Sequence, residues 1–298
     1  MGTAELASPC LEVVAKLTGH EIVLVITQPD RPKGRNLQPA PPPVKVTAEK
    51  LGLPVQQPVK MSEPAAIELV RAARPDLIVV VAYGQILPKT LLEIPGQGCI
   101  NVHTSLLSRW RGASPIQQAI LHGDAETGVT TMFLTEELDA GDIIFQRRTP
   151  VLPEDTGASL HDRLAGMGAE LLTETVEAIA RGDAPRRAQD AGLVTYARKI
   201  AKEDGRIVWS RPAVEIERQV RAFDPWPGTF TYLGEMMLKV WKVQIVDAVA
   251  APGELNGEVV GTGSGGLRLL EVQPAGKRRM AFADFLRGHP FGGKVVME

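Results

Sequence analysis

The sequence has 298 residues, of which 44% are hydrophobic and 23% are charged, and its net charge is −2 at neutral pH. This length allows two domains that each bury a core without disulfides or metals. The composition excludes a disordered or fibrous chain. The near-neutral charge argues against a strongly basic nucleic-acid-binding protein, although the part from Asp190 onward is slightly basic.

Targeting segments and metal-ligand patterns are missing from the sequence. No apolar run approaches the roughly 18 residues that span a bilayer, and no basic and apolar leader begins the chain. Two cysteines, Cys10 and Cys99, and scattered histidines give neither a disulfide framework nor the spacing of a metal site. We therefore expect a cytoplasmic protein without membrane association and without a metal.

The first half of the chain alternates short apolar runs with helical patterns. Strands that are buried on both faces and alternate with helices predict a parallel α/β sheet, whose ligands bind beyond the carboxyl ends of the strands. The predicted strands are Glu21–Thr27, Asp76–Ala82 and Gly98–Val102, and the predicted helices are Cys10–Leu17, Val44–Leu51, Ala65–Ala73 and Leu87–Glu93.

Two further strands, Val129–Leu134 and Ile143–Arg148, and a long amphipathic helix, Thr156–Arg181, complete this part. After a junction of mixed polar, Ala and Gly residues, short strands punctuated by Gly and Pro predict a small β-barrel, for which an OB-like barrel is one candidate. We predict a first domain over 1–182, a linker over 183–200 and a second domain over 201–298. The second domain has a helix at Val214–Phe223 and strands at Thr229–Leu233, Met237–Val246, Gly257–Gly261 and Gly266–Glu271.

Asn101 and His103, separated by one residue, lie at the carboxyl end of a predicted buried strand. Residues two apart on a strand face the same side, so a carboxamide and an imidazole point toward one ligand and can hold a developing oxyanion. Asp139 precedes Gly141, which permits a tight turn. This set suits transfer of an acyl group to an amine, with Asp139 helping the proton leave, but spacing alone leaves a structural role for the histidine equally open.

The same residues carry a resemblance. The run NVHTSLLSRWRG followed by ELDAGDII resembles the signature of folate-dependent formyltransferases. The resemblance implies an α/β chain with a Rossmann-like parallel-sheet catalytic domain and a smaller OB-like domain. It implies 10-formyltetrahydrofolate as formyl donor and no metal, with Asn101, His103 and Asp139 as the catalytic residues. The implied folate contacts are Ser105, Leu106, Leu107 and Ser108, together with Tyr83, Gly84 and Ile86 in a second pocket wall.

Ser108 stands where the family usually has proline. Loss of the fixed φ of proline should make this turn less rigid, which affects how the folate is held more than the chemistry.

Three further matches are similar to the branch of the family that acts on initiator methionyl-tRNA. They are the basic loop TQPDRPKGR, the segment FDPWPG and the basic stretch QPAGKRRM, and TYARKIAKEDGRI extends them. Clustered cations neutralise phosphates, although each cluster alone also fits a solvated turn. The tRNA contacts that the resemblance implies are Arg31, Lys33, Arg35, Lys199, Lys202, Lys277 and Arg278, and we expect the protein to be a monomer.

Members of this family begin with a hydrophobic strand that ends at the Gly-Thr seen here as Gly2-Thr3. We therefore expect the assigned start to lie downstream of the true one, because the loss of a central strand leaves neighbouring backbone groups unpaired.

Other functions stay open from the sequence. A formyltransferase that acts on an amino-sugar nucleotide shares the same core. An enzyme of purine synthesis would leave the last hundred or so residues without a role, because its fold has a single domain. An inactive RNA-binding module would not need Asn101, His103 and Asp139.

Overall fold

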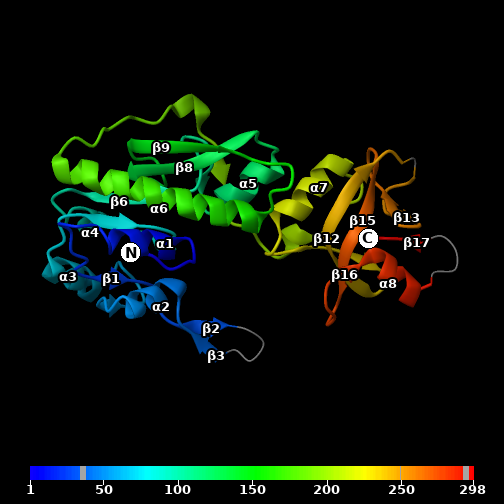
Figure 1. The fold of residues 1–298 in the computed structure, drawn as a ribbon, viewed down its shortest axis with the longest axis horizontal. Coiled ribbons are helices and arrows are strands. Elements are labelled where there is room, and N and C mark those ends of the chain that lie inside the picture. The colour runs from blue at the N-terminus through cyan, green and yellow to red at the C-terminus, as the bar shows by residue number, and fades with distance from the viewer. Residues whose placement is uncertain (34–37, 249, 291–294) are drawn as a thin grey trace. The chain divides into compact units, whose positions relative to one another are not determined.

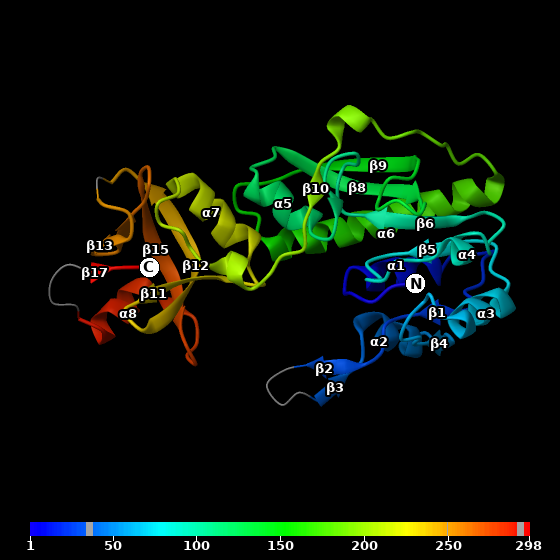
Figure 2. The ribbon, with the colours of Figure 1, turned by 180° about the vertical axis from the view of Figure 1, so that it is seen from behind.

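The computed structural model describes residues 1–33, 38–248, 250–290 and 295–298, and the chain forms two compact units (Figures 1 and 2). Residues 183–197, most of the segment that we predicted to be a linker, belong to the first unit. Unit 1 comprises Met1–Pro115, Glu126–Pro150 and His161–Ala197, and unit 2 comprises Ile116–Ala125, Val151–Leu160 and Arg198–Glu298.

Unit 1 begins with the predicted alternation of helices and parallel strands. Valine and isoleucine fill the strands, and proline at the first helical position starts α2 and α3. Strand β1 pairs with β4, and β5 pairs with β6, in each case in parallel. The helices are α1 (Ala7–Val14), α2 (Pro43–Lys50), α3 (Pro64–Ala73) and α4 (Lys89–Leu92), and the strands are β1 (Val25–Ile26), β4 (Val55–Gln56), β5 (Ile78–Val80) and β6 (Cys99–His103).

Met1 and Gly2 join β1 and β5 at their carboxyl ends. Gly2 donates a backbone hydrogen bond to Ile26 (3.0 Å), and Met1 accepts one from Val81 (2.9 Å). A largely apolar cavity of about 430 Å³ adjoins this junction and is lined by β1, β5, α1 and α6 among others. The expectation of an upstream strand stays a prediction.

The sheet continues from β6 with two antiparallel strands, β8 (Glu126–Phe133) and β9 (Ile143–Pro150). They form a hairpin because the short loop between them leaves no room for the crossover that a parallel pair requires. Helix α6 (Gly157–Arg181) lies along this part of the sheet (Figure 1). Gly168 lets the helix approach closely, since a Cβ there would stand 3.1 Å from the Val102 side chain.

Short elements complete unit 1. Strands β2 (Arg31–Lys33) and β3 (Gln38–Ala40) form a hairpin that begins within the basic stretch TQPDRPKGR, which we had interpreted as a loop. Strand β7 (Arg111–Gly112) pairs in parallel with β10 (Tyr196–Ala197). The pairing of β7 with β10 connects the loop after β6 to the segment that follows α6.

Unit 2 contains a barrel, as predicted. Its strands pair in the order β11-β12-β15-β14-β13-β17, and backbone hydrogen bonds between Tyr232 and Glu298 (2.8 and 2.9 Å) connect the last strand region back to β11. Trp209, Ile216, Leu238 and Phe282 are among its buried core. The strands are β11 (Thr229–Leu233), β12 (Met236–Val246), β13 (Glu254–Asn256), β14 (Val259–Gly261), β15 (Gly266–Pro274), β16 (Met280–Ala281) and β17 (Val295–Val296), and the helices of this region are α5 (Pro115–Leu121), α7 (Ala213–Ala222) and α8 (Phe282–Gly288).

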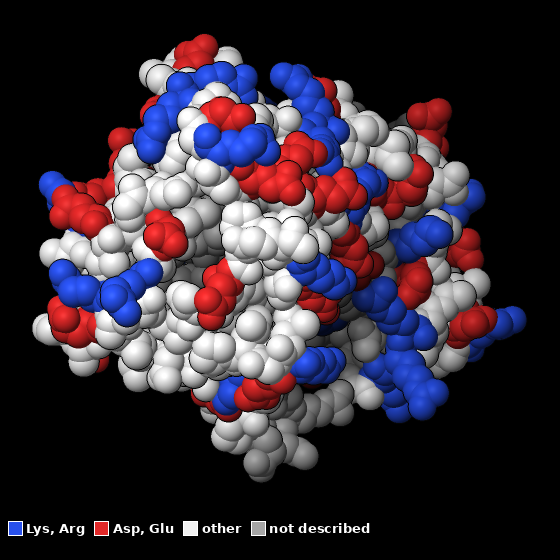
Figure 3. All heavy atoms as spheres, turned by 60° about the vertical axis from the view of Figure 1, so that its left-hand side comes forward, with Lys and Arg blue, Asp and Glu red and all other residues white. Residues whose placement is uncertain are grey.

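Positive and negative side chains are interspersed on the face drawn in Figure 3. Exposed ion pairs such as Arg147–Glu170 (2.6 Å) fit this pattern. A mixed surface of this kind produces no strong field of one sign, in agreement with the net charge of −2. No helix among the described residues is long and apolar enough to span a membrane.

Truncation of Leu164 tests the packing of α6. The side chain of Leu164 is 0% exposed, so Leu164→Ala should lower the free energy of unfolding by about 2 to 5 kcal/mol. Glu170→Ala on the exposed side of the same helix should cost less than about 1 kcal/mol. Urea denaturation of both variants measures the difference, and equal losses would contradict this packing.

Candidate active site

Strand β6 presents Asn101 and His103 on one face of the sheet. It lies between β5 and β8, where Asn101 pairs with Val80 and Met132. The two residues are 9% and 7% exposed. They are two apart on a strand that is hydrogen-bonded on both sides, so their side chains project together from a rigid support.

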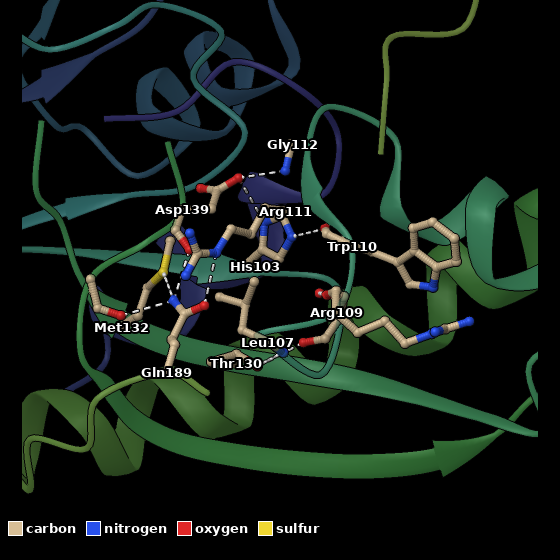
Figure 4. A network of polar contacts seen from close by, with 12 residues as sticks. His103, Leu107, Arg109, Trp110, Arg111, Gly112, Thr130, Met132, Asp139 and Gln189 are labelled. Carbon is tan, nitrogen blue, oxygen red and sulfur yellow. Dashed lines mark hydrogen bonds and ion pairs between the residues drawn. The ribbon is translucent and has the colours of Figure 1, made fainter. Parts of the chain in front are cut away.

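The imidazole of His103 is oriented by a backbone carbonyl. Its Nε2 lies 2.8 Å from the Trp110 oxygen (Figure 4). A carbonyl oxygen only accepts hydrogen bonds, so Nε2 carries a proton and donates it. In the neutral ring Nδ1 is therefore unprotonated and is the nitrogen that can gain a proton.

Asp139 lies against the second nitrogen of His103. Its Oδ2 is 3.7 Å from Nδ1, and its side chain is 12% exposed. The same oxygen accepts a hydrogen bond from the Gly112 backbone N–H at 2.8 Å. The backbone of Asp139 has φ +49°, a left-handed conformation that non-glycine residues rarely adopt. The structure thus places Asp139 beside His103, and Asn101 lies two residues before His103 on the same strand.

A partly buried network that we did not predict from the sequence surrounds the Asp139 loop. Gln189 donates hydrogen bonds to the backbone oxygens of Asp139 (2.7 Å) and Gly141 (2.9 Å) and accepts one from Arg111 Nε (3.0 Å). Arg111, which is 7% exposed, also contacts Glu137 at 3.2 Å. Arg111 lies within the formyltransferase-like run of the sequence, but nothing local in the sequence pointed to Gln189.

The turn Ser105–Ser108 is fixed by β8 and β9. Thr130 Oγ1 accepts a hydrogen bond from the Leu107 N–H (3.2 Å) and donates one to the Ser105 oxygen (2.7 Å), and Gln146 donates to the Leu107 oxygen (2.8 Å). The peptide bond between Leu107 and Ser108 is cis. Ser105, Leu107 and Ser108 are buried, whereas Leu106 is partly exposed.

The second predicted folate wall is only partly accessible. The Tyr83 ring is 1% exposed and packs in the core of unit 1, and this burial raises the pKa of its hydroxyl to about 12. The predicted folate contact of Tyr83 stays a prediction. Gly84 is exposed with φ +83°, and Ile86 is 86% exposed.

The predicted tRNA-binding cations lie in both units. In unit 1, Arg31 is exposed on β2 and donates a hydrogen bond to Gln28 (2.6 Å). Lys33 ends β2, and Arg35 lies outside the described residues. In unit 2, the exposed members are Lys199, Lys202, Lys277 and Arg278.

Asp30 pairs with a basic residue near this hairpin. Hydrogen bonds from Gln57 (2.7 Å) and Lys45 (2.9 Å) lower the pKa of its carboxyl group. Lys45 is thus partly neutralised within the protein.

Family models match both units of the chain. The formyl transferase model matches residues 1–176, and the model of the formyl transferase C-terminal domain matches residues 199–290. The methionyl-tRNA formyltransferase of Citrifermentans bemidjiense is 50% identical over 97% of this chain and 92% of its own length. The chain belongs to the formyl transferase family. The methionyl-tRNA formyltransferase of Trichlorobacter lovleyi is 48% identical, with 100% of this chain and 96% of the relative covered.

Solved structures share the fold of this formyl transferase. The N-formyltransferase of Helicobacter canadensis, crystallised with folinic acid and dTDP-3-aminofucose, matches with a TM-score of 0.67 at 18% identity, over 93% of this chain and 97% of its own. HypX of Aquifex aeolicus in complex with tetrahydrofolic acid matches with a TM-score of 0.59 at 22% identity, over 81% of this chain and 43% of its own. At these identities the likeness concerns the fold.

In this formyl transferase, the described residues contain no group of three or more His, Cys, Asp or Glu side chains arranged to hold a metal ion. The side chains of Asn101, His103 and Asp139 supply a hydrogen-bond donor, an imidazole and a carboxylate, which are groups that can serve acyl transfer.

Gly141 allows the close approach of the Asp139 loop to β8. A Cβ at this position would stand 1.8 Å from the Phe133 backbone oxygen, so Gly141→Ala must displace the loop. We expect turnover to fall at least about tenfold, since small displacements of catalytic groups are costly. Ala140→Gly is the matched control, and steady-state kinetics compare the two. Wild-type turnover in Gly141→Ala would contradict this account of the loop.

Proposed function

We propose that this formyl transferase moves the formyl group of 10-formyltetrahydrofolate to the amino group of methionyl initiator tRNA. The observation that carries the proposal is the approach of Asp139 to His103, at 3.7 Å, where His103 lies on the strand that also bears Asn101. The substrate assignment is supported by the names of relatives that are 45 to 50% identical over 97% of the chain. Translation initiation is a cytoplasmic process, and we place the protein there.

Attack of the methionyl amine on the formyl carbon places negative charge on the formyl oxygen and leaves a proton to be removed from nitrogen. In our proposal the carboxamide of Asn101 donates a hydrogen bond to that oxygen. Such a donor stabilises the transition state more than the ground state, because the charge develops only during the reaction. No covalent enzyme intermediate is needed.

His103 and Asp139 handle the proton in this proposal. Because the Trp110 carbonyl already accepts the Nε2 proton, Nδ1 is the nitrogen that takes up the proton from the attacking amine. The resulting imidazolium then faces the carboxylate of Asp139, which stabilises the positive charge. When the tetrahedral intermediate collapses, the bond between the formyl carbon and the folate nitrogen breaks. That nitrogen takes up the proton from His103, so tetrahydrofolate leaves and the imidazole is neutral again. His103 can also stabilise an oxyanion through Nδ1, but only after this protonation.

The folate is proposed to bind between the braced turn Ser105–Ser108 and the wall formed by Gly84 and Ile86. An isoleucine side chain that is 86% exposed offers apolar surface to a flat pterin ring, and burial of that surface favours binding. The backbone groups of the turn supply directed hydrogen bonds.

The tRNA is proposed to contact cations in both units. The acceptor end of the tRNA is contacted by Arg31, Lys33 and Arg35. The phosphate backbone is contacted by Lys199, Lys202, Lys277 and Arg278. The overall charge of −2 means that local clusters, and not the field of the whole protein, must attract the RNA.

Replacement of His103 tests the chemistry. His103→Ala should lower turnover at least about a hundredfold, because it removes the group that takes the proton. His161→Ala, at a partly exposed histidine on α6, is the matched control. The assay uses labelled formyl-folate with charged initiator tRNA, and near-normal turnover would remove His103 from the mechanism.

The same assay with a dTDP-amino sugar as acceptor distinguishes the proposed function from the alternative in which the enzyme acts on an amino-sugar nucleotide. We expect formylation of methionyl-tRNA and none of the sugar, and preference for the sugar would refute the proposed acceptor.

Removal of cations in unit 2 tests tRNA binding. Replacement of both Lys277 and Arg278 by alanine should weaken tRNA use and leave the KM for folate unchanged. The dependence of kcat/KM on salt should become shallower by about 1 in log–log slope for each phosphate that the variant no longer neutralises. Arg181→Ala, which removes an exposed cation paired with Asp183 (3.0 Å), is the control. An unchanged slope would contradict the assigned contact.

A further inference from the structure

We propose that Gln189 is a positioning residue for formyl transfer, whose carboxamide holds the loop that carries Asp139 against His103. This inference rests on the role proposed above for Asp139. Gln189 lies after helix α6, in the segment that the sequence suggested to be a linker. Its hydrogen bonds go to the Asp139 loop and to Arg111. It would act on the reaction through the Asp139 loop.

The hydrogen bonds of Gln189 fix its carboxamide in one orientation. Nε2 donates to the Asp139 oxygen at 2.7 Å and to the Gly141 oxygen at 2.9 Å, and Oε1 accepts from Arg111 Nε at 3.0 Å (Figure 4). Both N–H groups of the amide are used in this way. A flipped amide would turn its oxygen toward two carbonyl oxygens and its nitrogen toward an N–H donor, so the network permits a single assignment.

The Asp139 loop needs support of this kind. The backbone of Asp139 at φ +49° is in the left-handed region, which residues other than glycine adopt uncommonly and which the surroundings must hold in place. The Gly112 N–H holds the Asp139 side chain, and Gln189 holds the backbone on both sides of Ala140. Together they fix the carboxylate at its distance from His103.

Gln189 is itself held by the sheet and by Arg111. Arg187 exchanges two backbone hydrogen bonds with Ile143 (2.8 and 3.0 Å), and β10 pairs with β7 further along the segment. The segment is thus attached to the site on both sides of Gln189. The buried guanidinium of Arg111, in contact with Glu137 at 3.2 Å, completes the support by directing Oε1.

Gln189→Glu is the informative substitution. It keeps the length of the side chain and the acceptor for Arg111, but it replaces both N–H donors by an oxygen that repels the Asp139 and Gly141 carbonyls. We expect kcat to fall by about 30- to 100-fold, as for a catalytic group displaced by roughly 1 Å, while the KM for formyl-folate changes less than about threefold. Asp190→Asn, at the exposed neighbouring position, should leave both constants unchanged.

Hydrogen exchange of the Gly112 amide gives a readout that is independent of activity. This amide donates to Asp139 Oδ2, so release of the loop should raise its exchange rate at least about tenfold in Gln189→Glu and in Asp139→Ala, but not in Asp190→Asn. Amides of β6 and β8 serve as internal references for the fold. If they too lose protection, Gln189→Asn, which is shorter and uncharged, replaces the glutamate variant and is judged by the same outcomes.

Unchanged Gly112 exchange or a wild-type kcat in the folded variant would overturn the role of Gln189. The exchange measurement needs no substrate, so it decides this role even if the wild-type enzyme fails to formylate methionyl-tRNA. That failure would instead refute the proposed acceptor.

Discussion

The Asp139 carboxylate is the group on which the site depends, because it alone among the three proposed catalytic side chains comes from a loop. Asn101 and His103 are positioned by β6, which is hydrogen-bonded to β5 on one side and β8 on the other. Asp139 reaches them through a left-handed backbone conformation and a hydrogen bond from the Gly112 N–H. Oδ2 of Asp139 thereby lies 3.7 Å from Nδ1 of His103, the nitrogen that takes up the proton in the proposed transfer.

Several parts of unit 1 meet at this loop. Gly141 lets it approach Phe133, and the segment after α6 returns to bind it from outside the sheet. That segment also pairs with the loop after β6 through β10 and β7. The two sources of proposed catalytic side chains, β6 and the β8–β9 loop, are therefore held together by backbone pairing as well as by side chains. Accurate placement of this kind is what a reaction without a covalent intermediate requires.

Much of the fold could be predicted from the periodicity of apolar residues and from the Gly and Pro residues between the elements. Strand Thr229–Leu233 has the predicted bounds, and the long helix begins one residue later than predicted, at Gly157. The apolar run from Glu21 to Thr27 was read as one strand, but β1 contains only Val25 and Ile26, since pairing with the short β4 limits it. The β2–β3 hairpin was missed because the stretch TQPDRPKGR was interpreted as a loop, whereas Pro32 and Pro39 occupy paired positions.

The candidate site was predictable where side chains follow one another on a strand, as Asn101 and His103 do. The exposure of Ile86 and the burial of the Tyr83 ring could not be read from the sequence, because both residues lie in the same short strand exit. Gln189 could not be predicted for a different reason. Its partners are backbone oxygens that are distant in the sequence, and the residues around Gln189 do not indicate such contacts.

A double-mutant cycle on His103 and Asp139 tests the central claim most directly. Turnover is measured for the wild type, for His103→Ala, for Asp139→Ala and for the double variant. If the two side chains act as one proton-handling pair, the double variant should be hardly slower than the worse single variant, because the second substitution removes a function that is already absent. Fully additive losses in the free energy of activation would show that they act independently and would contradict this account.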